Sequence, residues 1–150
     1  MVRVVNLNKV KGLSLEKGLV YVNGKLRIDC EYIGRGSSFG NRFKIGVDGS
    51  RSEVVKLYWK WFYDELKLKG ELWNLMRRLV VLEEDLKLRG RELNLVCFCA
   101  PLRCHGDVLK KWIEFVVTKR AEARERGAQK PEVATKKVRK TRSKKEAVAV

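Results

Sequence analysis

The chain has 150 residues, of which 45% are hydrophobic and 35% are charged, and it carries a net charge of +16. This length and apolar content suffice for one domain with a hydrophobic core and exclude a chain that is disordered throughout. No apolar run reaches the length of a membrane span and no signal peptide is recognisable, so we expect an intracellular or virion protein without a membrane partner. The positive charge is atypical of a general cytosolic enzyme and indicates a polyanionic partner.

The charge is concentrated toward the C-terminus. Residues 119–150 hold twelve Lys and Arg against four Glu, a net charge of +8, and the first 118 residues carry the other +8. Residues 136–145 contain seven Lys and Arg and no apolar period, which predicts disorder in the unbound state. We therefore expect a compact domain over residues 1–118, followed over residues 119–150 by a helix extension and a basic tail. The single Gln and single His lean toward a thermophilic composition.

The first part of the chain has the pattern of short strands joined by turns. Asn23-Gly24 separates two apolar runs and predicts a hairpin over residues 19–28, because both residues accept a positive φ. The other expected elements are a polar connection over residues 9–18, a glycine-rich loop over residues 34–41, and strands over residues 2–7, 31–33 and 42–45.

Helical patterns dominate the remainder. Ser50 and Glu53 have the spacing of a capping box, and an apolar residue then recurs at helical spacing as far as Leu66. A second apolar stripe ends at Gly90, a strand follows over residues 93–99, and a last helix opens at residue 106 or 107. The predicted fold is α/β: a small sheet of about four to five strands, including an added hairpin, packed by three helices, plus the basic C-terminal tail.

Three cysteines and the single histidine lie within nine positions. Cys97, Cys99, Cys104 and His105 are suitable ligand types for one zinc ion. The spacing is unusual, because zinc sites usually combine two distant pairs of ligands. Cys97 and Cys99 share one face of the expected strand and are typical of buried small hydrophobic residues. We expect no cofactor, with zinc as the alternative.

A second interpretation treats the end of this segment as a reactive site. Cys104 and His105 precede the expected start of a helix, where the partial positive charge of the helix lowers a thiol pKa. The carboxyl end of a strand in an α/β sheet is also where ligands bind. We therefore expect Cys104 and His105 to lie at a functional site.

The glycine-rich loop has the composition of an anion site. Glycines let backbone N–H groups approach a phosphate, serine hydroxyls donate hydrogen bonds, and arginine supplies a bidentate fork. Its spacing matches neither the P-loop nor the dinucleotide-binding motif, so an ordinary turn is the alternative. The candidate phosphate-binding residues are Arg35, Gly36, Ser37, Ser38, Asn41 and Arg42.

Basic residues beyond residue 118 are candidates for phosphate-backbone contacts, which give affinity without base specificity. They are Arg124, Arg126, Lys136, Lys137, Arg139, Lys140, Arg142, Lys144 and Lys145. A solubilising tail is the alternative. Within the aromatic run 58–63, Tyr58 and Phe62 fall on the core stripe, whereas Trp59 lies beside it and is expected to contact a partner or cover a site.

Two segments together resemble a known family. Residues 32–43 resemble the signature YIGRxSxxGNPF, and residues 97–109 resemble the signature CxCAPLxCHGDVL, both of the domain of unknown function 4326 family. The resemblance extends over roughly residues 2–117. This sequence departs from the pattern at Arg42, which replaces a proline, at residues 16–30, which look like an inserted hairpin, and in the added tail.

The resemblance implies a compact α/β domain without an assigned activity. It also implies that the glycine-rich loop and the Cys/His segment form one site, lined by Arg35, Ser37, Asn41, Cys104, His105 and Asp107.

Two functions follow as expectations. The first is a nucleic-acid-associated protein, binding DNA or RNA through its basic body and tail in a chromatin-like, ribosomal or virion role, with a homo-oligomer or larger assembly as a further expectation and a zinc-binding module as a further alternative. The second is an enzyme that modifies a nucleotide or nucleic acid, with Cys104 as nucleophile, His105 as acid or base and Asp107 in the same catalytic set.

Overall fold

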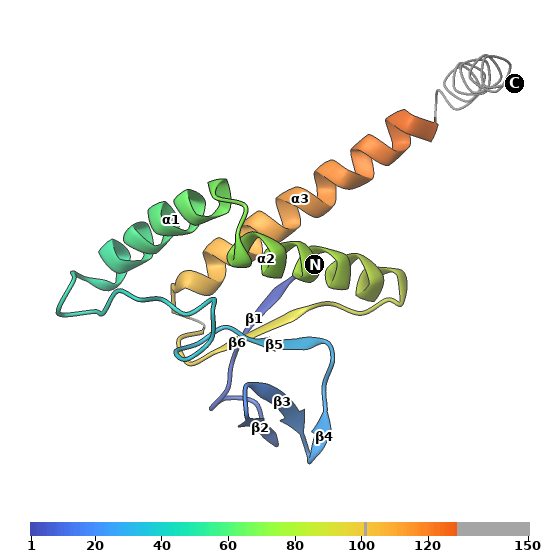
Figure 1. The fold of residues 1–150 in the computed structure, drawn as a ribbon. Helices are drawn as coiled ribbons and strands as arrows, with labels where there is room; N and C mark the ends of the chain where they lie inside the picture. Colours follow the sequence, from blue (N-terminus) through green and yellow to red (C-terminus); the bar gives the residue numbers. More distant parts are fainter. Residues whose placement is uncertain (101, 129–150) are drawn as a thin grey trace, which may run out of the picture. The chain divides into compact units, whose positions relative to one another are not determined.

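The computed structural model describes residues 1–100 and 102–128 of the chain. It divides the chain into two units, Met1–Val117 and Thr118–Val150. The elements are β1 (Arg3–Asn6), β2 (Leu13–Glu16), β3 (Leu19–Val22), β4 (Lys25–Leu26), β5 (Cys30–Tyr32), α1 (Arg51–Lys67), α2 (Glu71–Leu88), β6 (Asn94–Cys97) and α3 (His105–Ala128) (Figure 1). The described residues of the second unit, 118–128, belong to α3. No helix among the described residues is long and apolar enough to cross a bilayer.

The first sheet has the strand order β1-β6-β5, and all three strands are parallel. Its central strand, β6, has three consecutive buried residues, Leu95, Val96 and Cys97. Such a run is typical of a parallel strand that is covered on both faces. In Figure 1 the helices of the first unit lie on one side of these strands and the second sheet lies on the other.

Because the three strands of the first sheet are parallel, their carboxyl ends meet at one edge of the sheet. Ligands bind at this edge in α/β sheets.

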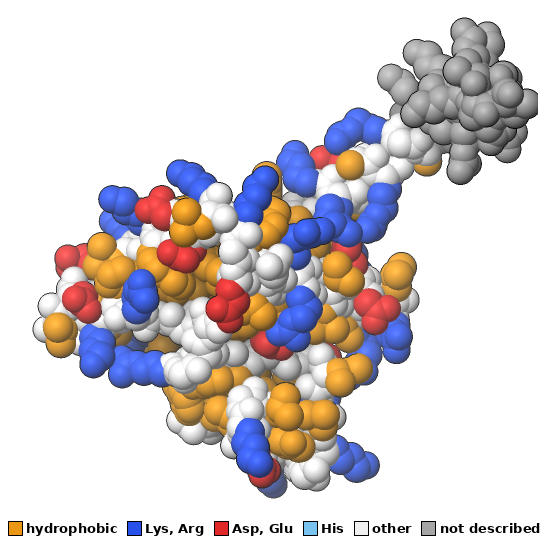
Figure 2. Space-filling view, viewed as in Figure 1, with side chains coloured by type: hydrophobic (Ala, Val, Ile, Leu, Met, Phe, Trp, Pro, Cys, Tyr) orange, Lys and Arg blue, Asp and Glu red, His pale blue; other side chains and the backbone are white. Residues whose placement is uncertain are grey.

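The second sheet is an antiparallel meander, β2-β3-β4. The predicted Asn23-Gly24 turn is confirmed, with φ of 51° and 78°. A second turn of the same kind, Lys17-Gly18 with φ of 50° and 78°, joins β2 to β3. The prediction of a polar connection over residues 9–18 was therefore wrong, because Leu13 and Leu15 alternate with polar residues in a strand. Figure 2 shows hydrophobic side chains gathered over this sheet, and Leu19 and Leu26 are among the exposed ones.

The α/β class with three helices is confirmed, while the strands divide between two sheets. They divide because β3 pairs with β2 and β4, whereas β6 pairs with β1 and β5. Residues 42–45 do not form a strand, and Ile45 makes an isolated bridge to Gly49 instead.

The predicted capping box at the start of α1 is confirmed. Ser50 Oγ accepts a hydrogen bond from the Glu53 N–H, and the Glu53 carboxylate accepts one from the Ser50 N–H, both at 3.3 Å.

The core fills the space between the first sheet and the helices. Tyr58, Phe62, Met76, Leu95 and Ile113 are fully buried members of one hydrophobic cluster. The expectation that Tyr58 and Phe62 belong to the core is confirmed. Burial of side chains this large contributes roughly 1.5–3 kcal/mol each to the transfer free energy.

A buried carboxylate connects the hairpin to the sheet. Asp29 is only 3% exposed and accepts a bidentate pair of hydrogen bonds from Arg27, at 2.8 and 2.7 Å, and another from Arg91 at 2.8 Å. Its backbone carbonyl accepts from the Asn94 N–H at the start of β6. The hydrogen bonds from Arg27 hold the pKa of Asp29 below its usual range.

We expect Asp29→Asn to lower the free energy of unfolding by about 1–3 kcal/mol, because it removes a buried charge from two guanidinium groups. The loss is measurable by urea denaturation at neutral pH. Since the pKa of Asp29 is lowered by folding, the advantage of the wild type is present above about pH 4 and disappears as the pH falls through the lowered pKa. Asp85→Asn is the matched control, since its exposed pair with Arg89 should contribute less than about 0.5 kcal/mol.

Candidate functional site

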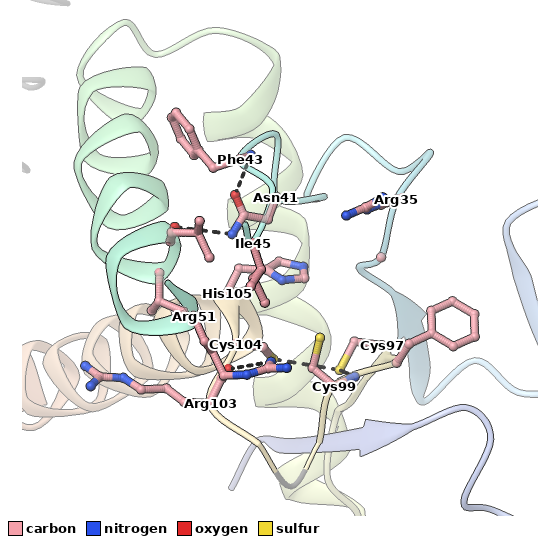
Figure 3. Close-up of a pocket in the computed structure, with 14 residues that line it drawn as sticks. Arg35, Asn41, Phe43, Ile45, Arg51, Cys97, Cys99, Arg103, Cys104 and His105 are labelled. Atoms are coloured by element: carbon pink, nitrogen blue, oxygen red, sulfur yellow. Dashed lines mark hydrogen bonds between the residues drawn. The ribbon is translucent and has the colours of Figure 1, made fainter. Parts of the chain in front are cut away.

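A pocket of about 370 Å³ lies at the carboxyl edge of the first sheet. It brings together the glycine-rich loop after β5, the start of α1 and the Cys/His segment between β6 and α3 (Figure 3). Its lining residues are Gly34, Arg35, Asn41, Phe43, Ile45, Arg51, Val54, Val55, Cys97, Phe98, Cys99, Arg103, Cys104 and His105. The expectation that the two signature segments meet therefore holds for Arg35, Asn41, Cys104 and His105.

Two sulfur atoms are in contact in the wall of this pocket. Cys97 Sγ and Cys104 Sγ lie 3.8 Å apart, and the backbone N–H of Cys99 donates to Cys97 Sγ at 3.5 Å. The hydrogen bond from Cys104, together with the N–H groups of Cys99 and Ala100, lowers the pKa of Cys97 to about 6 despite its burial. The contact between the two sulfur atoms therefore favours the thiolate on Cys97 and the thiol on Cys104.

The expected lowering of the Cys104 pKa was wrong. Its hydrogen bond to the Cys97 thiolate and its burial raise the pKa of Cys104 well above the usual range, and these effects exceed the opposing hydrogen bond from the Gly106 N–H. The more nucleophilic sulfur is consequently Cys97, at the end of β6, because the thiolate is the reactive form. From its position in the expected strand, Cys97 had been interpreted as a buried small hydrophobic residue of the core.

His105 connects the two signature segments through its ring. It is 6% exposed, its Nε2 lies 2.6 Å from the backbone oxygen of Ile33, and its ring meets Tyr58 edge-on. A carbonyl can only accept, so Nε2 carries the proton. Burial lowers the pKa of His105, which keeps the ring neutral at physiological pH. This contact holds the start of α3 against the end of β5.

The residues on either side of His105 shape the turn. Asp107 does not line the pocket; its carboxylate accepts from the Cys104 N–H at 3.1 Å, as in a helix cap. A Cβ on Gly106 would lie 2.9 Å from Ile33 Cδ1 and 3.0 Å from Val4 Cγ1. The helix can approach the sheet this closely because residue 106 has no side chain.

The side chains of the glycine-rich loop are largely engaged within the protein. Ser37 Oγ donates to the Gly34 carbonyl at 2.6 Å, and the Asn41 amide bridges the Phe43 N–H and the Val54 carbonyl. Of the six candidate phosphate-binding residues, Arg35 and Asn41 line the pocket of Figure 3. All six line a neighbouring hollow of about 350 Å³, together with Gly40 and Trp61, whose ring lies 4.9 Å from the Arg42 guanidinium.

Three arginines line the pocket and give it a positive charge: Arg35, Arg51 and Arg103. Arg35 lies on the glycine-rich loop, and Arg51, the first residue of α1, donates to the backbone oxygen of Arg103 at 3.3 Å. In Figure 3 Arg51 reaches toward the segment before α3 and Arg35 lies on the opposite side, while the Arg103 side chain extends away from the sulfur atoms. Within residues 1–100 and 102–128, neither Arg35 nor Arg51 forms an ion pair with a carboxylate.

The four-ligand zinc site does not form with the side chains as they are placed. In the described part of the chain, no group of three or more His, Cys, Asp or Glu side chains is positioned to hold a metal ion. His105 directs Nε2 to a carbonyl, and Cys97 and Cys104 hydrogen-bond to each other.

Other candidates lie away from the pocket. Trp59 is 44% exposed, stacks on Tyr63 at 5.5 Å and does not line the pocket, so it does not cover this site. Arg124 and Arg126 lie in α3. The remaining tail candidates lie outside the described residues: Lys136, Lys137, Arg139, Lys140, Arg142, Lys144 and Lys145.

Several lining residues were missed by the sequence analysis. Arg51 had a usable signal, because the capping box fixes where α1 begins. The apolar lining residues of the loops had none, since apolar side chains that are exposed or half-buried in loops are common: Phe43, Ile45 and Phe98.

Comparison with known proteins identifies one family. The family model for a domain of unknown function (DUF4326) matches residues 18–115, which include every pocket residue and begin within the hairpin. No curated protein and no solved structure matches the chain.

Gly106→Ala should destabilise the first unit by about 1–3 kcal/mol, because the new Cβ would overlap Ile33 and Val4. Thermal or urea unfolding measures the loss. Gly127→Ala in the same helix is the matched control: nothing lies near its Cβ, so the better helix propensity of alanine should leave stability unchanged or raised. Equal stability of both variants would contradict the close helix–sheet contact.

A thiolate should persist in the native protein down to about pH 6. Ultraviolet thiolate absorbance, followed from pH 4 to pH 9, should show a step near that value which Cys97→Ser removes. Cys30→Ser should retain the step, because burial raises the pKa of the Cys30 thiol to about 11. A step that survives in Cys97→Ser would assign the thiolate to another residue.

Proposed function

This chain belongs to the DUF4326 family, and we propose that it is a nucleic-acid-associated protein whose folded unit binds a nucleotide in the pocket of Figure 3. The nucleotide is either free or the end of a nucleic-acid strand. Its phosphate lies between Arg35 and Arg51, and its base and sugar lie against the apolar lining.

The observation that carries this proposal is the pair of arginines without carboxylate partners. Arg35 and Arg51 belong to different segments and both line one pocket. Guanidinium groups that are not neutralised within the described residues attract an anion, and their planar fork suits phosphate. The start of α3, also at the pocket, adds the partial positive charge of a helix N-terminus.

The remaining lining suits a flat, weakly polar group. Phe43, Ile45, Val54 and Val55 line the pocket, and Phe98, which is 49% exposed, adds a ring that meets Tyr32 edge-on. A volume of about 370 Å³ is within the range of small-molecule sites. A ligand with one phosphate and one base therefore satisfies both parts of the lining.

The charge distribution supports association with a longer polyanion. The first 118 residues and the remaining 32 each carry a net charge of +8. Lys and Arg on this scale contact phosphates without reading sequence, so the affinity should fall steeply with salt. In this proposal the pocket holds one nucleotide and the basic residues beyond it contact neighbouring phosphates.

A nucleotide-modifying enzyme is the second candidate, favoured by the position of the Cys97 thiolate. A thiolate in the wall of a pocket that binds a nucleotide is a potential nucleophile. Cys104, with its raised pKa, is suited to donate a hydrogen bond or a proton to it. Turnover that is lost in Cys97→Ser while nucleotide affinity is retained would support this candidate.

Calorimetric titration with a nucleoside monophosphate tests the proposal. We expect Arg35→Gln and Arg51→Gln each to weaken binding by about tenfold, because each removes a charge-assisted contact to the phosphate. The matching nucleoside without phosphate should bind the wild type more weakly by a similar or larger factor.

Arg77→Gln is the matched control, because Arg77 is exposed on α2, is absent from the pocket lining and changes the net charge equally. Its affinity should stay within about twofold of the wild type. Salt titration with a single-stranded oligonucleotide gives a second readout, since loss of one phosphate contact should lower the salt slope by about 1. Equal affinities of the three variants, or equal binding of nucleoside and monophosphate, would contradict the proposal.

A further inference from the structure

We propose that Cys97 and Cys104 form a modification site at which a hydroperoxide converts the two thiols into a disulfide bond within the pocket wall. This inference goes beyond nucleotide binding and depends first on the geometry of the two sulfur atoms. None of the four cysteines forms a disulfide in this structure.

The two sulfur atoms are already in contact. Their separation of 3.8 Å compares with about 2.05 Å in a disulfide, so the two sulfur atoms must come closer by about 1.8 Å for the bond to form. One sulfur ends β6 and the other immediately precedes α3, so the bond would close the segment that joins them. Cys30 lies at the start of β5, by Asp29, and does not line the pocket.

A small oxidant can reach the pair through the pocket. Cys97 is 1% exposed and Cys104 is 4% exposed, yet both line the 370 Å³ opening. Cys99 also lines the pocket and is more exposed, and its thiol lies near enough to Cys104 to affect the pKa of that group, but the sulfur–sulfur contact of 3.8 Å is between Cys97 and Cys104. The geometry therefore selects Cys97 and Cys104 as the pair that is joined.

Two steps convert the Cys97 and Cys104 thiols into a disulfide. The Cys97 thiolate attacks the terminal oxygen of the hydroperoxide, the O–O bond breaks, and an alcohol or water leaves after taking up a proton. Cys97 is then a sulfenic acid, having given two electrons to oxygen. Cys104 loses its proton and attacks the Cys97 sulfur; the S–S bond forms, the S–O bond breaks, and water leaves with that proton.

Oxidation would also change the charge of the proposed nucleotide site, a consequence that rests on the function proposed above. The reduced pair places a thiolate in the wall that holds the phosphate, and the disulfide is neutral. Removing a negative charge near Arg35 and Arg51 should strengthen phosphate binding by about threefold to tenfold.

Mass spectrometry of the full chain after treatment with hydrogen peroxide tests the site. We expect a loss of two hydrogen atoms and, after cleavage at Arg91 and Arg103, a disulfide that links residues 92–103 to the peptide that begins at Cys104; because residues 92–103 hold both Cys97 and Cys99, fragmentation of the linked peptides should place the bond on Cys97. Cys104→Ser should stop at the sulfenic acid, trapped by dimedone on Cys97. Cys97→Ser should lose both products. Cys99→Ser is the matched control and should form the disulfide at the wild-type rate.

A disulfide to Cys99 in the wild type, loss of the linkage in Cys99→Ser, or full-length protein that keeps all four thiols would overturn the proposal. Monophosphate titration of the reduced and oxidised proteins tests the coupling separately, and equal affinities would overturn it. Absence of nucleotide binding in both forms would reject the proposed function, whereas the mass measurement would still decide the disulfide.

Discussion

The contact between the start of α3 and the carboxyl edge of the parallel sheet is the constraint on which the pocket depends. Gly106 leaves no space between the helix and the side chains of Val4 and Ile33, and His105 joins its ring to the Ile33 carbonyl. This close approach carries Cys104 to within 3.8 Å of the sulfur that ends β6. Without it, the two signature segments would not share a wall, and the sulfur pair would not exist.

Several polar side chains of the two signature segments form hydrogen bonds with the backbone. These residues hold the loop and the turn in place, and other residues are proposed to contact a ligand. The side chains of Ser37, Asn41, His105 and Asp107 each form a hydrogen bond with a backbone group of the protein. The groups proposed to meet a ligand are the guanidinium groups of Arg35 and Arg51, which form no ion pair within the described residues, and the Cys97 sulfur in the pocket wall. A signature residue is thus weak evidence for catalysis when its side chain is needed to hold the turn that presents the site.

Local signals predicted the elements well and the site only in part. Ser50 with Glu53, and Asn23 with Gly24, encode their structures within four residues, so the start of α1 and the hairpin were predictable. The Lys17-Gly18 turn was missed because lysine at a positive φ has no strong sequence signal. The family resemblance predicted that Arg35 and Cys104 share a site, and both line the pocket. Which of the two thiols keeps its proton depends on the contact between the Cys97 and Cys104 sulfur atoms and on the nearby N–H groups of Cys99, Ala100 and Gly106, and the residue types alone do not reveal these contacts.

Side-chain alternation along β6 makes the position of the Cys97 sulfur depend on the length of that strand. Cys97 points to its partner because it ends a strand whose register is set on both sides, by Asn6 of β1 and by the pairing of Tyr32 with Val96. Deleting or inserting one residue in β6 would turn the sulfur to the opposite face. The β2-β3-β4 meander contributes no residue to the lining of the pocket. Length changes should therefore accumulate in the meander, while β6 and the segment to α3 change by substitution alone.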